Sequence, residues 1–286
     1  PRKTKDFKTL YPTTFLTAAR EMKDLAEARM IFSSLEFCKT TPFKDVYVHS
    51  TILTLQGKRM SKSLGVIINP LDLIKKYGPD ATRMGIIYGI SQEQQAAKFD
   101  ERNILAIQKF INKLSNINRF VAITTKQFPI SNSKLSKNLS IADKWILSRL
   151  NTVIQEITEK IENYKLGEAA QQLYDFVWHE YADWYLEISK IQIKKANHKT
   201  IKILNSSLEK ILKLLHPFIP FVTEKLWQEK NKENLLIVSK WPKADKGLID
   251  KKAEKEFEKI KEKIIEIRKE NPVQKLQDTP IVKKLI

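Results

Sequence analysis

Apolar residues recur every three or four positions through most of this chain, the spacing that places them on one face of an α-helix. The pattern predicts helices at about 21–37, 70–78, 80–88, 101–124, 140–164, 168–190, 198–215, 218–230 and 250–270. Those between 140 and 230 are separated by short breaks, so we expect an antiparallel bundle of at least four helices. The last helix has a narrow apolar stripe, which is typical of a packed arm or half of a coiled coil.

Polar residues mark where several of these helices begin. Asn69-Pro70 forms a turn before one helix, and Asp80 is expected to cap the helix that follows Gly78-Pro79. Ser140 and Asp143 have the spacing of a capping box. These residues therefore predict three helix starts.

Two short N-terminal segments carry strand-favouring residues, Thr13–Thr17 and Asp45–His49, with a helix between them. A basic loop bounded by Gly57 and Gly65 follows the second strand. This order is typical of a parallel α/β sheet with its ligand loop at the carboxyl ends of the strands. The remaining segments are expected to be a basic loop at 1–12, an extended stretch at 235–238 and a poorly ordered tail at 271–286.

The predicted fold class is mainly α with a partial α/β unit. A hydrophobic content of 42% with 7 Gly and 11 Pro is typical of a globular, helix-rich protein. Residues 126–139 are rich in Ser, Asn and Lys and make the best candidate linker. We expect four parts, at 1–90, 91–135, 136–245 and 246–286.

The charge indicates a polyanionic partner. Lys and Arg number 51 against 33 Asp and Glu, a net charge of +18 spread over most of the chain. Nucleic acid is the natural candidate, although a Lys-rich genome-wide composition is an alternative explanation. No apolar run is long enough to span a bilayer, so no membrane partner is expected. The single Cys38 excludes an internal disulfide and fits a cytoplasmic protein.

Candidate chemistry is concentrated in the stretch G-K-R-M-S-K-S-L-G at 57–65, which places three cations and two hydroxyl groups between two glycines. Such a loop suits the binding of a nucleotide triphosphate, while the alternative is a solvated basic turn. His49 is kept as a candidate because it ends a predicted strand just before the loop.

This stretch resembles the K-M-S-K-S signature of class I aminoacyl-tRNA synthetases, with Arg59 in place of the first lysine. The flanking D-V-Y-V-H-S and N-P-L-D-L-I-K-K-Y-G-P-D-A-T-R resemble the segments around that signature. Downstream, H-P-F-I-P-F-V-T-E-K-L-W-Q resembles the helical anticodon-binding domain of the valyl members of the family. The resemblance implies the end of a Rossmann-type catalytic domain at 1–90, a connecting helical region, an anticodon-binding bundle at 136–245 and a C-terminal helix and tail.

The resemblance implies that valine is activated with ATP and passed to tRNA-Val, by a protein that acts as a monomer. Lys62 would stabilise the charge on the leaving pyrophosphate and Arg59 would assist, with Mg²⁺ expected on the phosphates. The implied nucleotide-binding residues are Arg59, Met60, Ser61, Lys62, Ser63 and His49. An isoleucyl-type synthetase and a non-catalytic tRNA-binding helical protein remain alternatives.

Two expectations concern what this chain lacks. The family's other ATP signature, H-I-G-H, does not occur here, so we expect a piece of a longer polypeptide that cannot activate an amino acid by itself. Valyl enzymes also usually carry an aspartate and, five residues on, a tryptophan in the amino-acid pocket, where this chain has Glu21 and Ala26. Glu21 is the candidate for holding the ammonium group of the substrate, and Ala26 leaves one wall of the pocket unexplained.

Overall fold

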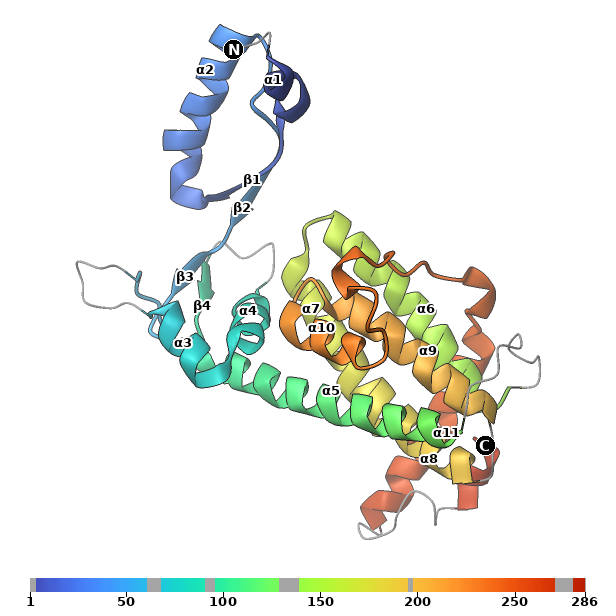
Figure 1. Cartoon of the computed structure of the whole chain (residues 1–286). Coiled ribbons are helices and arrows are strands. Elements are labelled where there is room, and N and C mark those ends of the chain that lie inside the picture. Colours follow the sequence, from blue (N-terminus) through green and yellow to red (C-terminus); the bar gives the residue numbers. More distant parts are fainter. Residues whose placement is uncertain are drawn as a thin grey trace.

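The computed structural model describes residues 4–60, 68–90, 96–128, 139–194, 198–270 and 280–285. An N-terminal α/β unit extends away from a large helical body (Figure 1). The unit consists of α1 (Lys5–Leu10), β1 (Thr13–Ala19), the 3-10 helix η1 (Arg20–Met22), the π-helical η2 (Lys23–Glu27), α2 (Ala28–Cys38) and β2 (Phe43–His49). The predicted strand–helix–strand order is therefore confirmed.

The strands β1 and β2 run parallel, with Thr13 opposite Phe43 and Ala19 opposite His49. Because the two strands end side by side, the residues that follow β1 and the end of β2 share one edge of the sheet. The expected loop at 1–12 is wrong in part. Residues 5–10 form α1, whose first turn is capped by Thr4, since its hydroxyl accepts a hydrogen bond from the Phe7 amide at 3.3 Å.

A second parallel pair joins the unit to the helical body. β3 (Thr51–Leu53) pairs with β4 (Ala96–Lys98), and α3 (Pro70–Tyr77) and α4 (Pro79–Ile87) lie between them in the chain. Asn69 begins α3 by accepting a hydrogen bond from the Leu71 amide at 3.1 Å, as the sequence predicts.

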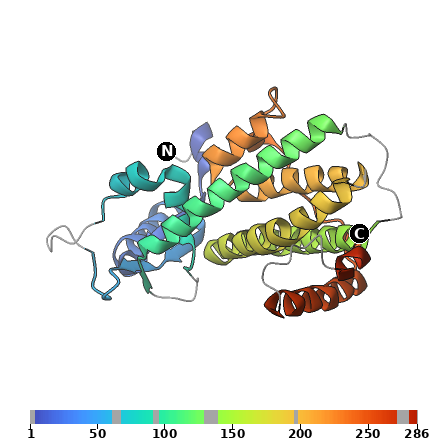
Figure 2. The ribbon, with the colours of Figure 1, turned by 90° about the horizontal axis from the view of Figure 1, so that it is seen from below.

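The helices of the body lie side by side (Figures 1 and 2) and share one apolar core. Its elements are α5 (Glu101–Gln127), α6 (Ile141–Glu162), α7 (Leu166–Asp175), the π-helical η4 (Phe176–Leu186), α8 (Glu187–Lys194), α9 (His198–Leu215), α10 (Pro220–Gln228), the 3-10 helices η5 (Leu236–Val238) and η6 (Lys246–Leu248), α11 (Lys251–Glu270) and η8 (Pro280–Lys284). Phe257 of α11 stacks on Trp145 of α6 with ring centroids 3.8 Å apart, so the last long helix is a packed arm.

The start of the bundle follows the sequence closely. The Ser140 hydroxyl accepts a hydrogen bond from the Asp143 amide at 3.1 Å and donates to the Asp143 carboxylate at 2.9 Å, which confirms the predicted capping box. The expected linker at 126–139 overlaps α5, which continues to Gln127, and residues 129–138 lie outside the described part of the chain.

The extended stretch expected at 235–238 is wrong, and the poorly ordered tail expected at 271–286 is wrong for residues 280–285, while residues 271–279 lie outside the described part of the chain. Residues 236–238 form a 3-10 helix because the Glu224 carboxylate accepts hydrogen bonds from the amides of Leu236 and Ile237. Residues 280–285 are packed on the body, where Val282 and Leu285 are buried and the Leu285 carbonyl accepts a hydrogen bond from the Ala142 amide.

Asp80 has a different role from the one predicted. Its carboxylate makes no cap on α4 but accepts hydrogen bonds from the Phe221 and Val222 amides at 3.2 and 2.6 Å, in the first turn of α10. Arg83 reaches the same corner, donating to the Pro217 carbonyl at 3.3 Å. Asp80 therefore caps a helix that is about 140 residues away in the chain.

Candidate functional site

A tight hairpin brings the chain to the first residues of the basic loop. The Thr54 amide donates to the Lys58 carbonyl and the Gly57 amide to the Thr54 carbonyl, both at 2.9 Å. Gly57 has a φ of 80°, a conformation that glycine adopts without steric cost. An antiparallel bridge between Leu53 and Arg59 closes the hairpin, which therefore sets the position of Arg59 relative to β3.

Arg59 and Glu21 are brought together although the sequence predicted separate roles for them. A guanidinium nitrogen of Arg59, Nη2, lies 2.9 Å from Glu21 Oε1, and the Thr51 hydroxyl donates to the same oxygen at 3.4 Å. Glu21 belongs to η1, directly after the end of β1. The candidate for the substrate ammonium group is thus paired with the first cation of the loop.

His49 lies at the same sheet edge. It ends β2 opposite Ala19, and its exposed imidazole has Nδ1 3.2 Å from the Ser50 carbonyl. The strand ending predicted for His49 is confirmed, and its proposed nucleotide contact stays a prediction. Met60 is the last described residue of the loop, and the candidates Ser61, Lys62 and Ser63 lie outside the described residues.

Ala26 lies in the π-helical turn η2 and is half-buried beside the buried Glu27. π-helical turns inside α-helical segments are frequent at functional sites. Glu27 Oε2 has no hydrogen-bond partner in the described part of the chain. The sequence offered no sign of this buried carboxylate, because Glu27 stands in the same charged stretch as Lys23 and Asp24. In the structure those two side chains are exposed.

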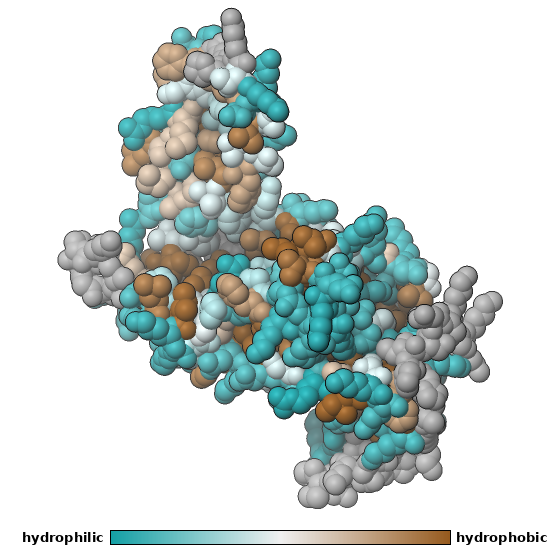
Figure 3. Space-filling model, in the orientation of Figure 1, coloured by the Kyte–Doolittle hydropathy of each residue, from teal (hydrophilic) through white to brown (hydrophobic). Residues whose placement is uncertain are grey.

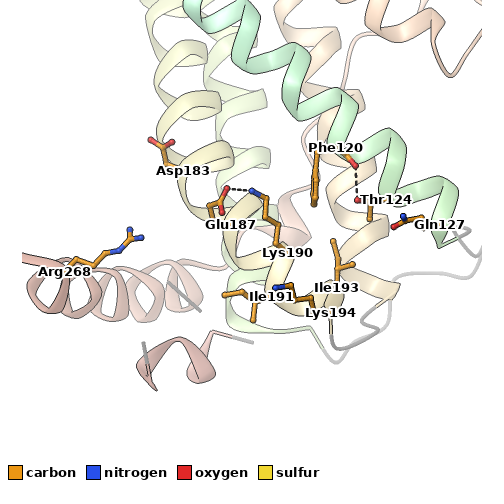
Figure 4. Close-up of a pocket in the computed structure, with 10 residues that line it drawn as sticks. All are labelled: Phe120, Thr124, Gln127, Asp183, Glu187, Lys190, Ile191, Ile193, Lys194 and Arg268. Carbon is orange, nitrogen blue, oxygen red and sulfur yellow. Dashed lines mark hydrogen bonds and ion pairs between the residues drawn. The ribbon is translucent and has the colours of Figure 1, made fainter. Parts of the chain in front are cut away.

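A second site candidate is a groove on the helical body that sequence reasoning missed (Figure 4). Side chains from the C-terminal half of α5, from η4 and α8, and from α11 surround a cavity of about 670 Å³. It is lined by Phe120, Thr124, Gln127, Asp183, Glu187, Lys190, Ile191, Ile193, Lys194 and Arg268. A neighbouring hollow of about 280 Å³ shares Phe120 and Lys190 and adds Lys113.

The groove combines an aromatic face with cationic groups. Lys190 Nζ lies 5.5 Å from the centre of the half-buried Phe120 ring and donates to the Glu187 carboxylate at 2.6 Å. Lys113 donates to Asp183 at 2.6 Å and lies 3.9 Å from the Trp178 ring centre. Both acidic residues of the lining therefore have a lysine partner, and Lys194 and Arg268 add further positive charge to the groove.

Aromatic side chains of η4 take part in the core of the helical body. Tyr181 and Tyr185 are fully buried there. Among the described residues, no group of three or more His, Cys, Asp or Glu side chains is arranged to hold a metal ion. None of the described helices is both long and apolar enough to cross a membrane.

Two sequence families match the chain. The tRNA synthetases class I (I, L, M and V) match residues 1–100, and the anticodon-binding domain of tRNA ligase matches residues 143–283. The chain is 40% identical over 273 residues to the valine--tRNA ligase of Clostridium tetani, covering 94% of this chain and 31% of that protein. The Thermotoga maritima valine--tRNA ligase is 38% identical over 265 residues, which cover 91% of this chain and 30% of that protein. The chain thus spans about a third of the length of these relatives.

Solved structures share the fold at low sequence identity. The Agrobacterium radiobacter K84 agnB2 LeuRS, in its ternary complex with tRNA and LeuAMS, has a TM-score of 0.68 at 17% identity, covering 84% of this chain and 29% of that one. Mycobacterium tuberculosis methionyl-tRNA synthetase, in complex with methionyl-adenylate, has a TM-score of 0.64 at 15% identity, covering 79% and 46%. The predicted fold class is confirmed by these neighbours.

Proposed function

The chain belongs to the class I tRNA synthetases, and from this premise we propose that it supplies the signature loop and the anticodon-binding domain of a valine--tRNA ligase. The observation that carries the proposal is the 40% identity with a valine--tRNA ligase over 94% of the chain. The two matching families follow one another in the chain, as the α/β unit and the helical body do.

In the proposed reaction, a carboxylate oxygen of valine attacks the α-phosphate of ATP and pyrophosphate leaves. The valyl group then passes to the terminal ribose of tRNA. Lys62 is proposed to stabilise the negative charge that develops on the leaving phosphates, with Arg59 assisting and Ser61 and Ser63 donating hydrogen bonds. Met60 and His49 border the nucleotide in this proposal, and Glu21 is available to the valine ammonium group.

ATP would bring Mg²⁺ with it. Since the described residues offer no carboxylate cluster, we assign the ion to the phosphate oxygens and to water, and no step here depends on it. Cys38 is a free cysteine and fits the proposed cytoplasmic location. The assembly proposed for the protein is a monomer.

We propose that the groove around Phe120 contacts tRNA. Phe120 offers a partly exposed ring on which an unpaired base could stack, while Lys190 and Arg268 line the same cavity and suit phosphate groups. Unpaired bases are what proteins read in RNA, because the edges of paired bases are hidden in a deep groove. The anticodon is such an unpaired segment.

The α/β unit leaves large apolar side chains open to solvent. Phe32 and Phe37 of α2 are 75% and 70% exposed, and Val46 and Val48 of β2 are exposed as well. A two-stranded sheet with one long and one short helix buries too little surface to form a complete pocket. We therefore propose that amino-acid activation needs a further protein layer over these faces, and that the chain alone gives no ATP–pyrophosphate exchange.

The tRNA half of the proposal can be tested with the chain itself. We expect it to bind tRNA with a valine anticodon about tenfold or more tightly than the same tRNA with a changed anticodon, at one fixed salt concentration. Equal affinity for the two tRNAs, or no binding, would contradict anticodon reading by this chain.

The catalytic half needs the missing layer, which a relative can supply. We propose to replace the corresponding third of the Clostridium tetani valine--tRNA ligase with this chain and to measure ATP–pyrophosphate exchange with valine, isoleucine and threonine. Valine should give the highest rate, and Lys62→Ala should lower that rate by about two orders of magnitude. A higher rate with isoleucine would favour the isoleucyl-type synthetase. A chimera that binds tRNA but shows no exchange would favour the non-catalytic tRNA-binding protein.

A further inference from the structure

Two departures from the usual synthetase pattern lie in contact in this structure. The loop has Arg59 where the signature has lysine, and the pocket segment has Glu21 where valyl enzymes usually have aspartate. They are 38 positions apart in the chain, yet Arg59 Nη2 lies 2.9 Å from Glu21 Oε1. The Arg59 side chain is longer than lysine, and the Glu21 side chain is longer than aspartate. The contact between them uses this extra length.

The surroundings hold both groups in place. Arg59 stands at the end of the hairpin closed by the bridge to Leu53, and Glu21 also accepts the hydrogen bond from the Thr51 hydroxyl. Arg59 remains 68% exposed, and the Glu21 side chain 38% exposed. The guanidinium is therefore paired but still accessible to an incoming anion.

The pair competes with both ligands of the proposed reaction. A guanidinium matches phosphate as well as carboxylate, and ATP carries several phosphate oxygens. While Glu21 holds Arg59, its carboxylate is partly neutralised and less able to attract an ammonium group. Transfer of Arg59 to a phosphate would leave Glu21 with an unpaired negative charge beside the sheet edge.

We propose that Glu21 is the positioning residue of Arg59, holding its guanidinium at the sheet edge until a phosphate group replaces the carboxylate. This inference rests on the proposed function, because it assumes that the phosphates of ATP reach Arg59. Once Arg59 has moved to phosphate, Glu21 is free to bind the ammonium group of the amino acid, so each substrate favours the binding of the other.

Asp24 offers a matched control for Glu21. It lies three residues away, and its contact is with Lys23 at 3.7 Å. Asp24→Asn removes the same charge from the same segment as Glu21→Gln without touching the Arg59 pair. Any general effect of the lost negative charge appears in both variants.

The first measurement is hydrogen exchange of the hairpin amides of Thr54, Gly57 and Lys58 in this chain. E21Q should accelerate their exchange about two- to fivefold, the scale of a lost exposed ion pair, while D24N should not. R59Q should have the same effect as E21Q, and the double variant E21Q/R59Q should exchange no faster than R59Q. Equal exchange in E21Q and D24N would overturn the proposal.

The second measurement is made in the chimera with the Clostridium tetani enzyme, where the layer over the α/β unit is supplied. Pyrophosphate is the probe, and phosphorus NMR reports its binding. E21Q should bind pyrophosphate about two- to fivefold more tightly than D24N, because a competing carboxylate is gone, and adding E21Q to R59Q should change nothing. Equal affinities of E21Q and D24N would overturn the proposal that a phosphate group replaces the Glu21 carboxylate as the partner of Arg59. If no variant binds pyrophosphate, the proposed function of the loop is contradicted, and hydrogen exchange alone decides whether Glu21 positions Arg59.

Discussion

Single buried carboxylates connect distant helices in this protein. Asp143 begins α6 and accepts hydrogen bonds from the Tyr185 hydroxyl at 2.7 Å and the Thr200 hydroxyl at 3.4 Å, from two other helical segments. Asp80 connects α4 to α10 by accepting hydrogen bonds from two backbone amides of α10. Burial raises the pKa of both carboxyl groups, although their hydrogen bonds oppose that shift.

Asp143 makes stability depend on pH in a direction that can be measured. Because its folded-state pKa is above the ordinary value of 3.8, the folded protein binds this proton more tightly than the unfolded chain. Its contribution to the free energy of unfolding therefore falls as pH rises from 3.8 through the folded-state pKa. We expect the difference in unfolding free energy, wild type minus D143N, to decrease as the pH rises above about 4 in urea titrations. An increase would mean that the hydrogen bonds outweigh burial.

Phe120 is the residue with which the groove can be tested. Replacing it with leucine keeps an apolar side chain but removes the aromatic face, so F120L should weaken tRNA binding about tenfold, as expected for a lost base stack. Phe32 of α2 is a suitable control, since it is 75% exposed and outside the groove. F32L should change the affinity less than about twofold, and equal effects of the two changes would exclude Phe120 as a stacking residue.

At the scale of elements, α4 packs closely against several helices of the body. A Cβ on Gly85 would lie 2.7 Å from the Ile104 Cα, so α4 and α5 can pack this closely only because residue 85 is glycine. At the C-terminal end of α4, Gly167 in the first turn of α7 lies against the backbone of residues 87 and 90. The capping of α10 by Asp80 completes a corner at which α4 contacts α5, α7 and α10.

Gly167→Ala tests this close contact. Alanine normally favours a helix over glycine by up to about 1 kcal/mol, but here the added Cβ would clash with the Ile90 carbonyl oxygen and lie 2.8 Å from that of Ile87. We expect G167A to lower the free energy of unfolding by about 1–3 kcal/mol in urea titrations. In G247A the nearest atom is the Asp245 carboxylate at 3.2 Å, a side chain that can move, so the change should stay within about 0.5 kcal/mol. A stabilised G167A would show that the contact is loose.

At the scale of the molecule, the two parts differ in how much they bury. The helical body surrounds one continuous core, whereas the α/β unit exposes apolar side chains on α2 and on both strands (Figure 3). One link between them is Tyr164, whose hydroxyl donates to Asp45 at 3.1 Å and whose ring lies 4.9 Å from that of Phe15.

This difference predicts unequal local stability. The amides of β1 and β2 should exchange with solvent deuterium at least about tenfold faster than those of α6, because few buried contacts oppose local opening of the unit. In the chimera with the Clostridium tetani enzyme, the same strands should become protected, while α6 should not change. Equal protection of strands and α6 in the isolated chain would contradict the proposed need for a covering layer.

Much of the local structure follows from short stretches of sequence. The apolar period of α5, the Asn69 cap and the Ser140–Asp143 capping box each depend on residues within a few positions of one another, and each prediction is confirmed. The parallel pair β1–β2 follows from the order of its elements. The 3-10 helix at 236–238 was missed because it depends on Glu224, on another helix.

The sequence by itself therefore determined the helices, the caps at Asn69 and Ser140, the parallel strands and, through the loop resemblance, the family. Only the tertiary structure decided which distant groups meet. It pairs Asp80 with α10, Arg59 with Glu21, and Phe120 with Lys190. Such contacts depend on how helices cross and how far side chains reach, and no local pattern of residues carries that information. The roles of Ser61, Lys62 and Ser63 stay predictions, since they rest on the loop sequence alone.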